Sequence, residues 1–340
     1  MISLLKSHIK NILFSYLISL FEIKKTSTIS YQIGICSFIC HKHVDMFIYN
    51  LMSLFYQLGK SLPLYVVDDG SLTPEDNKKL KKYFTVIIEP YRSSEEKISK
   101  ILRGYKNIFK FRFDEEVCDL RKKLDAFFLN PFEKFMYLDA DILFHNYPKE
   151  IILWLESKND EILYTVHLPY PRDFFNFEAA RVQYAYRFLL SKHLLIPVDP
   201  SFNTGFLCVP NKKSLSKLYL DKVLNQFYLH NFVCSWVSEE TALSFSFNNT
   251  NLKKLSPARY VNVWADEEYL KAFTNKTISL HYSGNVKYVK FKGDAIKLAI
   301  KYNLFWLNSS VRNSYDHRII LKILKILFKR KLNNNYRFSK

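Results

Sequence analysis

The sequence predicts an α/β fold in which a mainly parallel central sheet is flanked by helices, with an amphipathic helix at each end of the chain. Three observations predict this class. Strand and helix patterns alternate through the first half, and the apolar run Phe135–Leu138 ends in two nearby carboxylates, Asp139 and Asp141. Hydrophobic residues make up 48% of the 340 residues, enough to bury a substantial core.

The first 30 residues are expected to form an amphipathic helix that packs on the fold or on a membrane surface. Six apolar residues recur at helical spacing: Ile9, Ile12, Leu13, Tyr16, Leu17 and Leu20. The charge-free stretch Asn11–Phe21 is only 11 residues long, too short to span a bilayer. No small-residue cleavage site follows it, so a secretory signal is not expected.

Strand and helix patterns alternate from Tyr31 onward. The predicted strands are Ile33–Ile39, Leu64–Val67, Thr85–Glu89 and Phe135–Leu138. The predicted helices are Val44–Leu58, Pro74–Tyr83 and one near Glu95–Tyr105, and the segment Leu120–Leu129 precedes the last strand. Thr73 is a candidate N-cap, with Pro74 in the first turn. Beyond Tyr147 the pattern loosens, and we expect helices Lys149–Leu155, Phe177–Lys192 and Ser214–Phe227 and a strand Phe206–Val209.

Charge and cysteine content limit the partners. Fifty Lys and Arg against 32 Asp and Glu give a net charge of +18, which favours a polyanionic partner. Much of this charge lies in Arg318–Lys340, where a basic and an apolar helical face suit an anionic membrane; a terminal helix docked on the core is the alternative. No motif indicates nucleic-acid binding. Five cysteines, an odd number without a zinc-type spacing, favour a reducing, cytoplasmic location.

Asp139 and Asp141 are the strongest functional signal. Two hard oxygen ligands at the carboxyl end of a buried strand suit Mg²⁺ or Mn²⁺ beside a diphosphate. An isolated Asp-x-Asp also occurs in ordinary turns, so this motif alone does not distinguish a metal site from a turn. Asp68 and Asp69 follow an earlier strand and are candidates to face a nucleotide base or ribose, with a turn role equally expected.

Tyr137–Leu143 and His281–Lys287 together resemble the retaining GT-A glycosyltransferases of family 8, the glycogenin and lipopolysaccharide galactosyltransferase type. The resemblance covers roughly residues 33–290. It implies that Asp139, Asp141 and His281 bind the metal and that Lys287 binds phosphate. Gly284 would let the backbone approach the diphosphate. The implied cofactors are Mn²⁺, or Mg²⁺, and a nucleotide sugar, expected to be a UDP-sugar.

Softer matches occur in the same order as in that family. Phe202–Phe206 is similar to its Phe-Asn-x-Gly segment, so Asn203 is expected to line the sugar pocket. Lys123, rather than Lys122, is expected to contact the donor. Glu239 and Glu240 correspond to an acidic-plus-Gln segment near the transferred sugar. Glu240 stands where the family has Gln, which leaves the donor sugar open.

The resemblance implies metal-assisted transfer, with retention, to a glycan or glycolipid acceptor in a surface-glycan pathway. Together with the patterns at the two ends, it suggests an N-terminal helix (1–30), a nucleotide-sugar half (31–147), an acceptor-side half (148–300) and a basic tail (301–340). The tail would hold the protein at the cytoplasmic face of a membrane.

Three alternatives stay open. Inversion would need a carboxylate base, for which Glu239 or Glu240 would serve. A degenerate fold would make the chain a non-catalytic, membrane-associated sugar-nucleotide-binding protein. Asp139–Leu143 also fits a haloacid-dehalogenase-type phosphatase strand, although this strand lies far from the N-terminus and Gly293-Asp294 has no acidic partner shortly after it.

Overall fold

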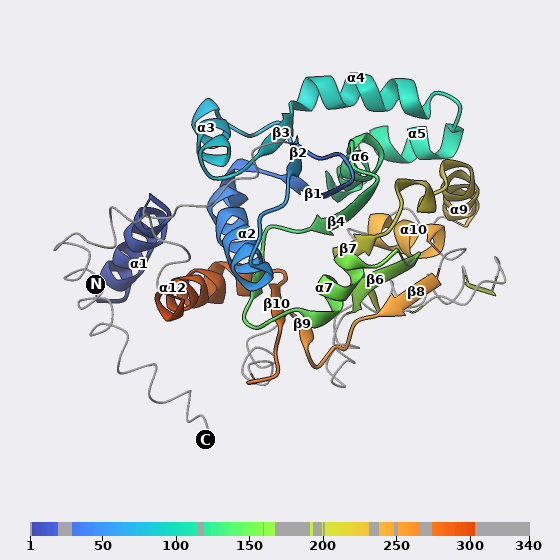
Figure 1. Cartoon of the computed structure of the whole chain (residues 1–340). Helices are drawn as coiled ribbons and strands as arrows, with labels where there is room; N and C mark the ends of the chain where they lie inside the picture. Colours follow the sequence, from blue (N-terminus) through green and yellow to red (C-terminus); the bar gives the residue numbers. More distant parts are fainter. Residues whose placement is uncertain are drawn as a thin grey trace.

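A seven-stranded sheet forms the centre of the molecule in a computed structural model of the chain (Figure 1). The structure describes residues 2–19, 29–114, 119–158, 160–166, 191–192, 199, 201–230, 238–247, 251–264 and 274–302. The strand order is β3 (Val86–Glu89), β2 (Leu64–Asp68), β1 (Ile33–Ile39), β4 (Lys134–Leu138), β7 (Phe202–Val209), β6 (Glu161–Val166) and β8 (Asn251–Lys254).

Only β7 runs against the other six strands of this sheet. It pairs antiparallel with both β4 and β6, while every other pairing in the sheet is parallel. The predicted α/β class with a mainly parallel central sheet is therefore confirmed. A second sheet of three strands, β5 (Ile142–Phe144), β10 (Ser279–Tyr282) and β9 (Tyr260–Val263), continues from the end of β4.

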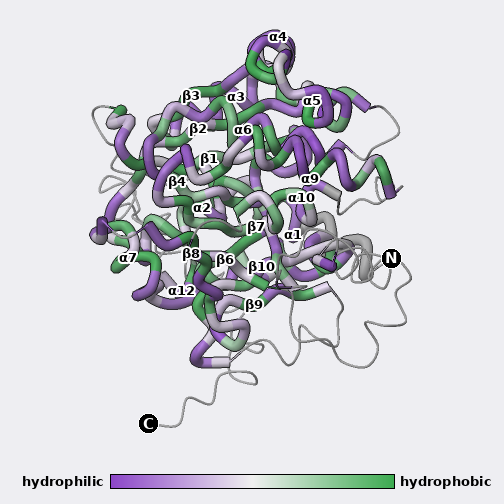
Figure 2. The backbone as a smooth tube through the Cα atoms, turned by 90° about the vertical axis from the view of Figure 1, so that its right-hand side faces the viewer, coloured by the Kyte–Doolittle hydropathy of each residue, from purple (hydrophilic) through white to green (hydrophobic). Residues whose placement is uncertain are grey.

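Helices cover both faces of the large sheet. Alternate residues of β4 enter two different cores, Met136 and Leu138 on one side and Phe135 and Tyr137 on the other. Because both faces are buried, the central strands are apolar almost throughout, as the hydropathy colouring shows (Figure 2). The helices are α2 (Val44–Leu58), α3 (Pro74–Tyr83), α4 (Tyr91–Leu102), α5 (Lys106–Phe113), α6 (Lys123–Leu129), α7 (Lys149–Glu156), α9 (Lys217–Leu229), α10 (Ser238–Ser246) and α12 (Lys292–Lys301).

Among the described residues, short helical turns join these elements: η1 (His41–His43), η2 (Asp119–Lys122), η4 (Lys212–Ser214) and η5 (Lys287–Phe291). Arg112 of α5 donates two hydrogen bonds of 2.7 Å to Asp125 of α6, and both side chains are about 1% exposed. Such a bidentate pair fixes orientation as well as distance. It therefore holds α6, whose first residue is Lys123, against the rest of the fold.

Several predicted elements are confirmed with their bounds. The strand β1 and the helices α2 and α3 begin and end as predicted, and Thr73 caps α3 through a reciprocal capping box with Asp76. The helix predicted to begin at Glu95 begins at Tyr91, directly after Pro90, which is extended and serves as the N-cap. The strand predicted from Phe206 begins at Phe202 because β7 pairs with both β4 and β6.

Other predictions differ from the structure or concern residues that the structure does not describe. The segment Leu120–Leu129, to which no element type was assigned, contains most of η2 and all of α6, and α5 and β6 were not predicted. The helix predicted over Phe177–Lys192, apart from its last two residues, lies outside the described residues, as does the basic tail Arg318–Lys340. No described helix is both long enough and apolar enough to cross a membrane.

The N-terminal helix is present as α1 (Ile2–Ser19), packed against α2 and α12 (Figure 1). Its buried face differs from the predicted stripe. Phe14, Leu17 and Ile18 are at most 2% exposed, whereas Ile12 and Tyr16, both expected on the apolar face, are 58% and 45% exposed. Ile12 and Tyr16, on the side of the helix opposite to Phe14, are therefore not part of the buried face.

Candidate active site

The predicted site residues meet where the chain changes direction across the large sheet. From β1 the chain passes outward to β2 and β3, then returns to β4 on the other side of β1. Such a switch point opens a crevice at the carboxyl ends of the strands. Because β7 runs antiparallel, its first residues lie at this same edge, and the backbone N–H of Asp139 donates to the carbonyl of Gly205 at 2.7 Å.

Strand register also brings in His281 from far along the sequence. β5 begins directly after Asp141, and β10 pairs with it so that His281 lies opposite Ile142. The N–H of Tyr282 donates to the carbonyl of Asp141 at 2.9 Å. Asp141 and His281, 140 residues apart in sequence, therefore become neighbours through a backbone ladder.

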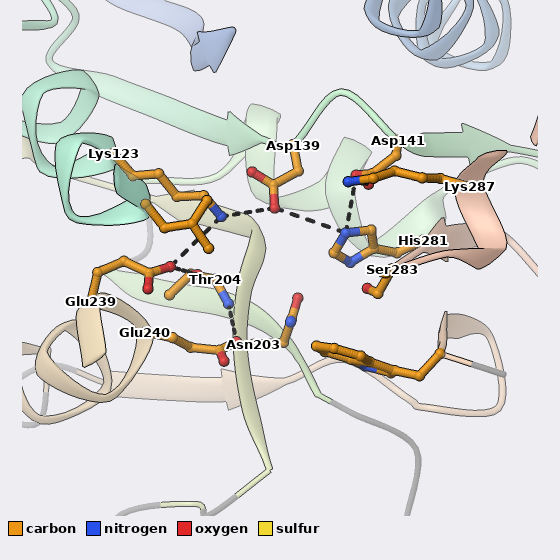
Figure 3. Close-up of a pocket in the computed structure, with 13 residues that line it drawn as sticks. Lys123, Asp139, Asp141, Asn203, Thr204, Glu239, Glu240, His281, Ser283 and Lys287 are labelled. Carbon is orange, nitrogen blue, oxygen red and sulfur yellow. Dashed lines mark hydrogen bonds and ion pairs between the residues drawn. The ribbon is translucent and has the colours of Figure 1, made fainter. Parts of the chain in front are cut away.

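Asp139, Asp141 and His281 each direct one ligand atom to a common point, within 4.8 Å of one another (Figure 3). The His281 Nε2 atom lies 3.2 Å from Asp141 Oδ1 and 3.8 Å from Asp139 Oδ2. Carboxylate oxygens with one imidazole suit Mg²⁺ or Mn²⁺. These residues thus fit the metal that the sequence implies.

Two lysines face these carboxylates. Lys123 Nζ lies 3.0 Å from Asp139 Oδ2, and Lys287 Nζ lies 3.1 Å from Asp141 Oδ2. Burial alone would raise the pKa of Asp141, but His281 and Lys287 outweigh it and hold that pKa well below the usual range. Burial would lower the pKa of each lysine, but Asp139 beside Lys123 and Asp141 beside Lys287 raise it, so both ammonium groups stay charged.

Glu239 and Glu240 enter the same cleft from the first turn of α10, where the helix dipole favours acidic side chains. Glu240 Oε1 accepts a hydrogen bond of 2.9 Å from the N–H of Thr204. Glu239 Oε1 lies 3.7 Å from Lys123 Nζ and 3.5 Å from the Thr204 hydroxyl. Burial raises the pKa of Glu239 to about 7, against the lowering effect of Lys123.

Gly205 is required for this arrangement. A Cβ atom at position 205 would lie 2.2 Å from Cε1 and 2.8 Å from Nδ1 of His281. A side chain there would overlap the imidazole in its present position beside the two aspartates. The glycine of the Phe-Asn-x-Gly segment thus has a packing role at the metal cluster, and Asn203 Oδ1 accepts a 3.0 Å hydrogen bond from its N–H.

Most of the predicted site residues line one cleft, and two do not. The cleft is lined by Leu120, Lys123, Asp139, Asp141, Asn203, Thr204, Glu239, Glu240, Trp264, His281, Ser283, Gly284 and Lys287. Gly284 adopts φ +57°, a backbone conformation that favours glycine. Lys122, over which Lys123 was preferred as the donor contact, is not among the lining residues and pairs with Asp119 at 3.1 Å.

Asp68 and Asp69 do not line the cleft. Asp68 Oδ1 accepts from the N–H groups of Gly70 and Leu72, and Asp69 Oδ1 accepts from the N–H and the hydroxyl of Ser71. These bonds form the turn after β2, the alternative role that the sequence left open. Contact of either carboxylate with a nucleotide stays a prediction.

Thr204, Trp264 and Ser283 are lining residues that sequence reasoning missed. Thr204 and Ser283 lie inside the motifs that were singled out, so their place beside Asn203 and Gly284 was the available signal. Trp264 directly follows β9, a strand that was not predicted. Asp294, considered for a phosphatase motif, is buried in α12 and accepts hydrogen bonds from Tyr282 and Lys297.

Comparison with known families supports part of this assignment. Residues 33–156 match the model of Mannosyl_trans3, a mannosyltransferase-like family. The match includes Asp139 and Asp141 but covers only roughly a third of the chain and ends well before His281. It supports a glycosyltransferase, as the sequence predicted, but not family 8 specifically. No curated protein matches the chain in sequence.

Solved structures of glycosyltransferases are distantly similar. Mouse xyloside xylosyltransferase 1 has 10% identity and a TM-score of 0.48, over 75% of this chain and 99% of that one. Galactosyltransferase LgtC with donor and acceptor sugar analogues has 12% identity and a TM-score of 0.46, over 82% and 99%. The bifunctional glycosyltransferase WbbM has 10% identity and a TM-score of 0.45, over 89% and 53%. Likenesses at these scores assign no activity to this chain.

Proposed function

We propose that this chain is a divalent-metal-dependent glycosyltransferase of the GT-A type, moving a sugar from a nucleotide sugar to a glycan or glycolipid. One observation carries the proposal. Asp139, Asp141 and His281 converge from separate strands at the switch point of the sheet, with Lys123 and Lys287 in the same cleft. Carboxylates, an imidazole and lysines together suit a metal and a diphosphate.

Asp139, Asp141 and His281 would hold the cation, which when bound neutralises negative charge on the diphosphate leaving group. The ammonium group of Lys287 forms an ion pair with Asp141 in this structure. From there it is placed to bind phosphate oxygens of the donor instead. Gly284, two residues after the end of β10, has no side chain to block a diphosphate from its backbone. Lys123 bridges the metal cluster and Glu239, so it can contact the donor between phosphate and sugar.

Asn203, Glu239 and Glu240 are proposed to surround the transferred sugar. The resemblance to family 8 favours retention, with the acceptor hydroxyl attacking from the face that the diphosphate leaves. Inversion has one supporting observation: the pKa of Glu239, raised by burial to about 7, suits a general base near neutral pH. The anomeric configuration of the product separates the two mechanisms.

The donor is proposed to be a UDP-sugar, and the family-model description adds a mannosyl donor as a specific candidate. We further propose that residues 31–147 bind the nucleotide sugar and 148–300 the acceptor. The protein would work at the cytoplasmic face of a membrane, held there in part by the basic tail 301–340.

A donor panel tests this function. UDP- and GDP-sugars are incubated with the full chain in Mn²⁺ or EDTA, and release of nucleoside diphosphate is followed. Turnover of one donor that stops in EDTA supports the transferase and names the sugar. Metal-dependent nucleotide binding without turnover would favour the non-catalytic sugar-nucleotide-binding protein instead.

A further inference from the structure

Tyr137 connects the buried core to the metal cluster formed by Asp139, Asp141 and His281. Its side chain is buried on β4, and its hydroxyl donates a hydrogen bond of 3.0 Å to Oδ1 of Asp139. Residues two apart on a strand point to the same face and are about 7 Å apart along it. A tyrosine two residues before Asp139 can therefore reach its carboxylate, and phenylalanine would place the same ring there without the donor.

The core holds the Tyr137 ring in place. The ring stacks on Phe127 of α6, with centroids 4.8 Å apart and planes at 20°. Phe127 in turn meets Phe135 edge-on at 6.0 Å, and all three rings belong to one buried cluster. Side chains in such close-packed surroundings have little room to move. The hydroxyl of Tyr137 is therefore a fixed donor.

The polar atoms of Asp139 are divided between the fold and the cleft. Its N–H donates to the Gly205 carbonyl at 2.7 Å, and its carbonyl accepts from Asn50 Nδ2 of α2 at 2.7 Å. Tyr137 donates to Oδ1. Oδ2 is directed to the cluster and lies 3.8 Å from His281 Nε2 (Figure 3). The fold thus fixes the backbone and one carboxylate oxygen of Asp139, and the other oxygen faces the cleft.

We propose that Tyr137 is a positioning residue for the metal cluster: its hydroxyl fixes the rotation of the Asp139 carboxylate, so that Oδ2 is the oxygen presented to the cation. This role rests on the proposed function, because it acts through a bound cation. Hydrogen bonds to a ligating carboxylate orient it, and losing such a partner typically weakens metal binding by about 10- to 100-fold.

The role predicts a change in ion preference as well as in affinity. Without the Tyr137 hydroxyl, the Asp139 carboxylate can turn and offer both of its oxygens. Ca²⁺ accepts bidentate carboxylates in a flexible geometry, whereas smaller ions with octahedral preferences depend more on each ligand's position. A hydroxyl that only stabilises the core would leave the ratio of Mn²⁺ to Ca²⁺ affinity unchanged.

Tyr137→Phe tests this role, because it removes the hydroxyl and keeps the ring. The matched control is Tyr65→Phe. Tyr65 lies in the same buried cluster on β2 and is 3% exposed, and its hydroxyl donates a hydrogen bond of 3.0 Å to Glu89, outside the cleft lining. Calorimetric titrations of the full chain with Mn²⁺ and with Ca²⁺, each with a nucleoside diphosphate present, give both affinities. Urea unfolding in EDTA shows that both variants are folded.

Tyr137→Phe should bind Mn²⁺ at least about tenfold more weakly than the parent, with Ca²⁺ affinity reduced by less than about twofold. Tyr65→Phe should keep both parental affinities. Parental Mn²⁺ affinity in Tyr137→Phe, or an equal loss for both ions, would overturn the proposal.

The parent chain gives a test that needs no variant. It should prefer Mn²⁺ to Ca²⁺, and equal affinities would also overturn the role of Tyr137. Absence of Mn²⁺ binding by the parent would remove the proposed function itself. A parent that binds Mn²⁺, beside a Tyr137→Phe variant with unchanged affinities, would remove only the role of Tyr137.

Discussion

The two ends of the cleft are built differently. At the proposed metal end, Asp139, Asp141 and His281 direct ligand atoms to one point, and Lys123 and Lys287 each pair with one of the two carboxylates. At the sugar end, Glu240 already accepts from the Thr204 N–H, and Glu239 lies between Lys123 and the Thr204 hydroxyl. The proposed metal end is a set of ligand atoms that could hold a cation, whereas the acidic side chains of the proposed sugar end already have hydrogen-bond partners within the protein.

Asp141→Asn should have the largest effect because it removes charge at the metal end. We expect donor turnover to fall by about a thousandfold, since a ligand and its electrostatic contribution are lost together. Steady-state hydrolysis of the preferred donor measures this. Asp160→Asn, at an exposed acidic position, should keep parental turnover. Equal losses in both variants would contradict the metal-end assignment.

Lys287→Ala should come next. Its ammonium group is proposed to stabilise the departing diphosphate, and loss of one such contact costs about a hundredfold in kcat. Lys290→Ala, in the same turn but outside the cleft lining, is the control and should change kcat by less than about twofold. A Lys287→Ala enzyme with normal kcat and only a raised KM would show that the lysine binds the donor without assisting departure.

Gly205→Ala should disturb the metal end through packing alone. The new methyl group would displace the His281 ring, and Mn²⁺ affinity should fall by about 10- to 100-fold. Gly104→Ala is the control, because no atom lies within 4 Å of a Cβ there. Calorimetric Mn²⁺ titration compares the two. Unchanged affinity in Gly205→Ala would mean that His281 is not a ligand or that it moves without cost.

Glu239 should give the sugar end a pH-dependent stability. Its folded pKa of about 7 lies above the reference value of 4.5, so the folded state binds a proton that the unfolded state releases between these values. The free energy of unfolding should therefore fall by about 1–3 kcal/mol as pH rises through this window. Glu239→Gln should remove this loss. Urea unfolding in EDTA at about pH 5 and about pH 8 measures the change in the free energy of unfolding between the two pH values. An equal change in the parent and in Glu239→Gln would contradict the burial of an uncharged Glu239.

Glu240→Gln should have the smallest effect. The glutamine carbonyl can still accept from the Thr204 N–H, so folding and metal binding should be unchanged. Because a charge next to the donor sugar is lost, we expect relative kcat/KM among donors to change by about two- to tenfold. The donor panel measures this ratio, and unchanged preferences would place Glu240 away from the sugar.

Local patterns predicted the first half of the fold well. The bounds of β1, α2 and α3 follow from apolar runs, periodicity and a capping box, all within a few residues of one another. β6, β8 and β9 were not predicted, and β7 was predicted too short. These strands are specified by partners far away in sequence, such as Leu163 opposite Cys208 and Ile162 opposite Leu252.

The candidate site likewise combines residues that local motifs predicted with contacts that depend on distant strand pairing. Residues of the Asp-x-Asp and His-x-x-Gly-x-x-Lys motifs line one cleft, because each motif lies at the end of a strand. The contact between Gly205 and His281 depends on the pairing of β4 with β7 and of β5 with β10, which no local pattern reports. The exposed side of α1 was likewise unpredictable, since periodicity alone does not say which apolar face the fold covers.

Mn²⁺ binding, followed by electron paramagnetic resonance with a nucleoside diphosphate present, tests the metal end most directly. The parent chain should bind one ion, Asp160→Asn should behave like the parent, and Asp139→Asn and His281→Ala should each weaken binding by at least about tenfold. Parental affinity in Asp139→Asn and His281→Ala would contradict the account, because the ion would then lie elsewhere.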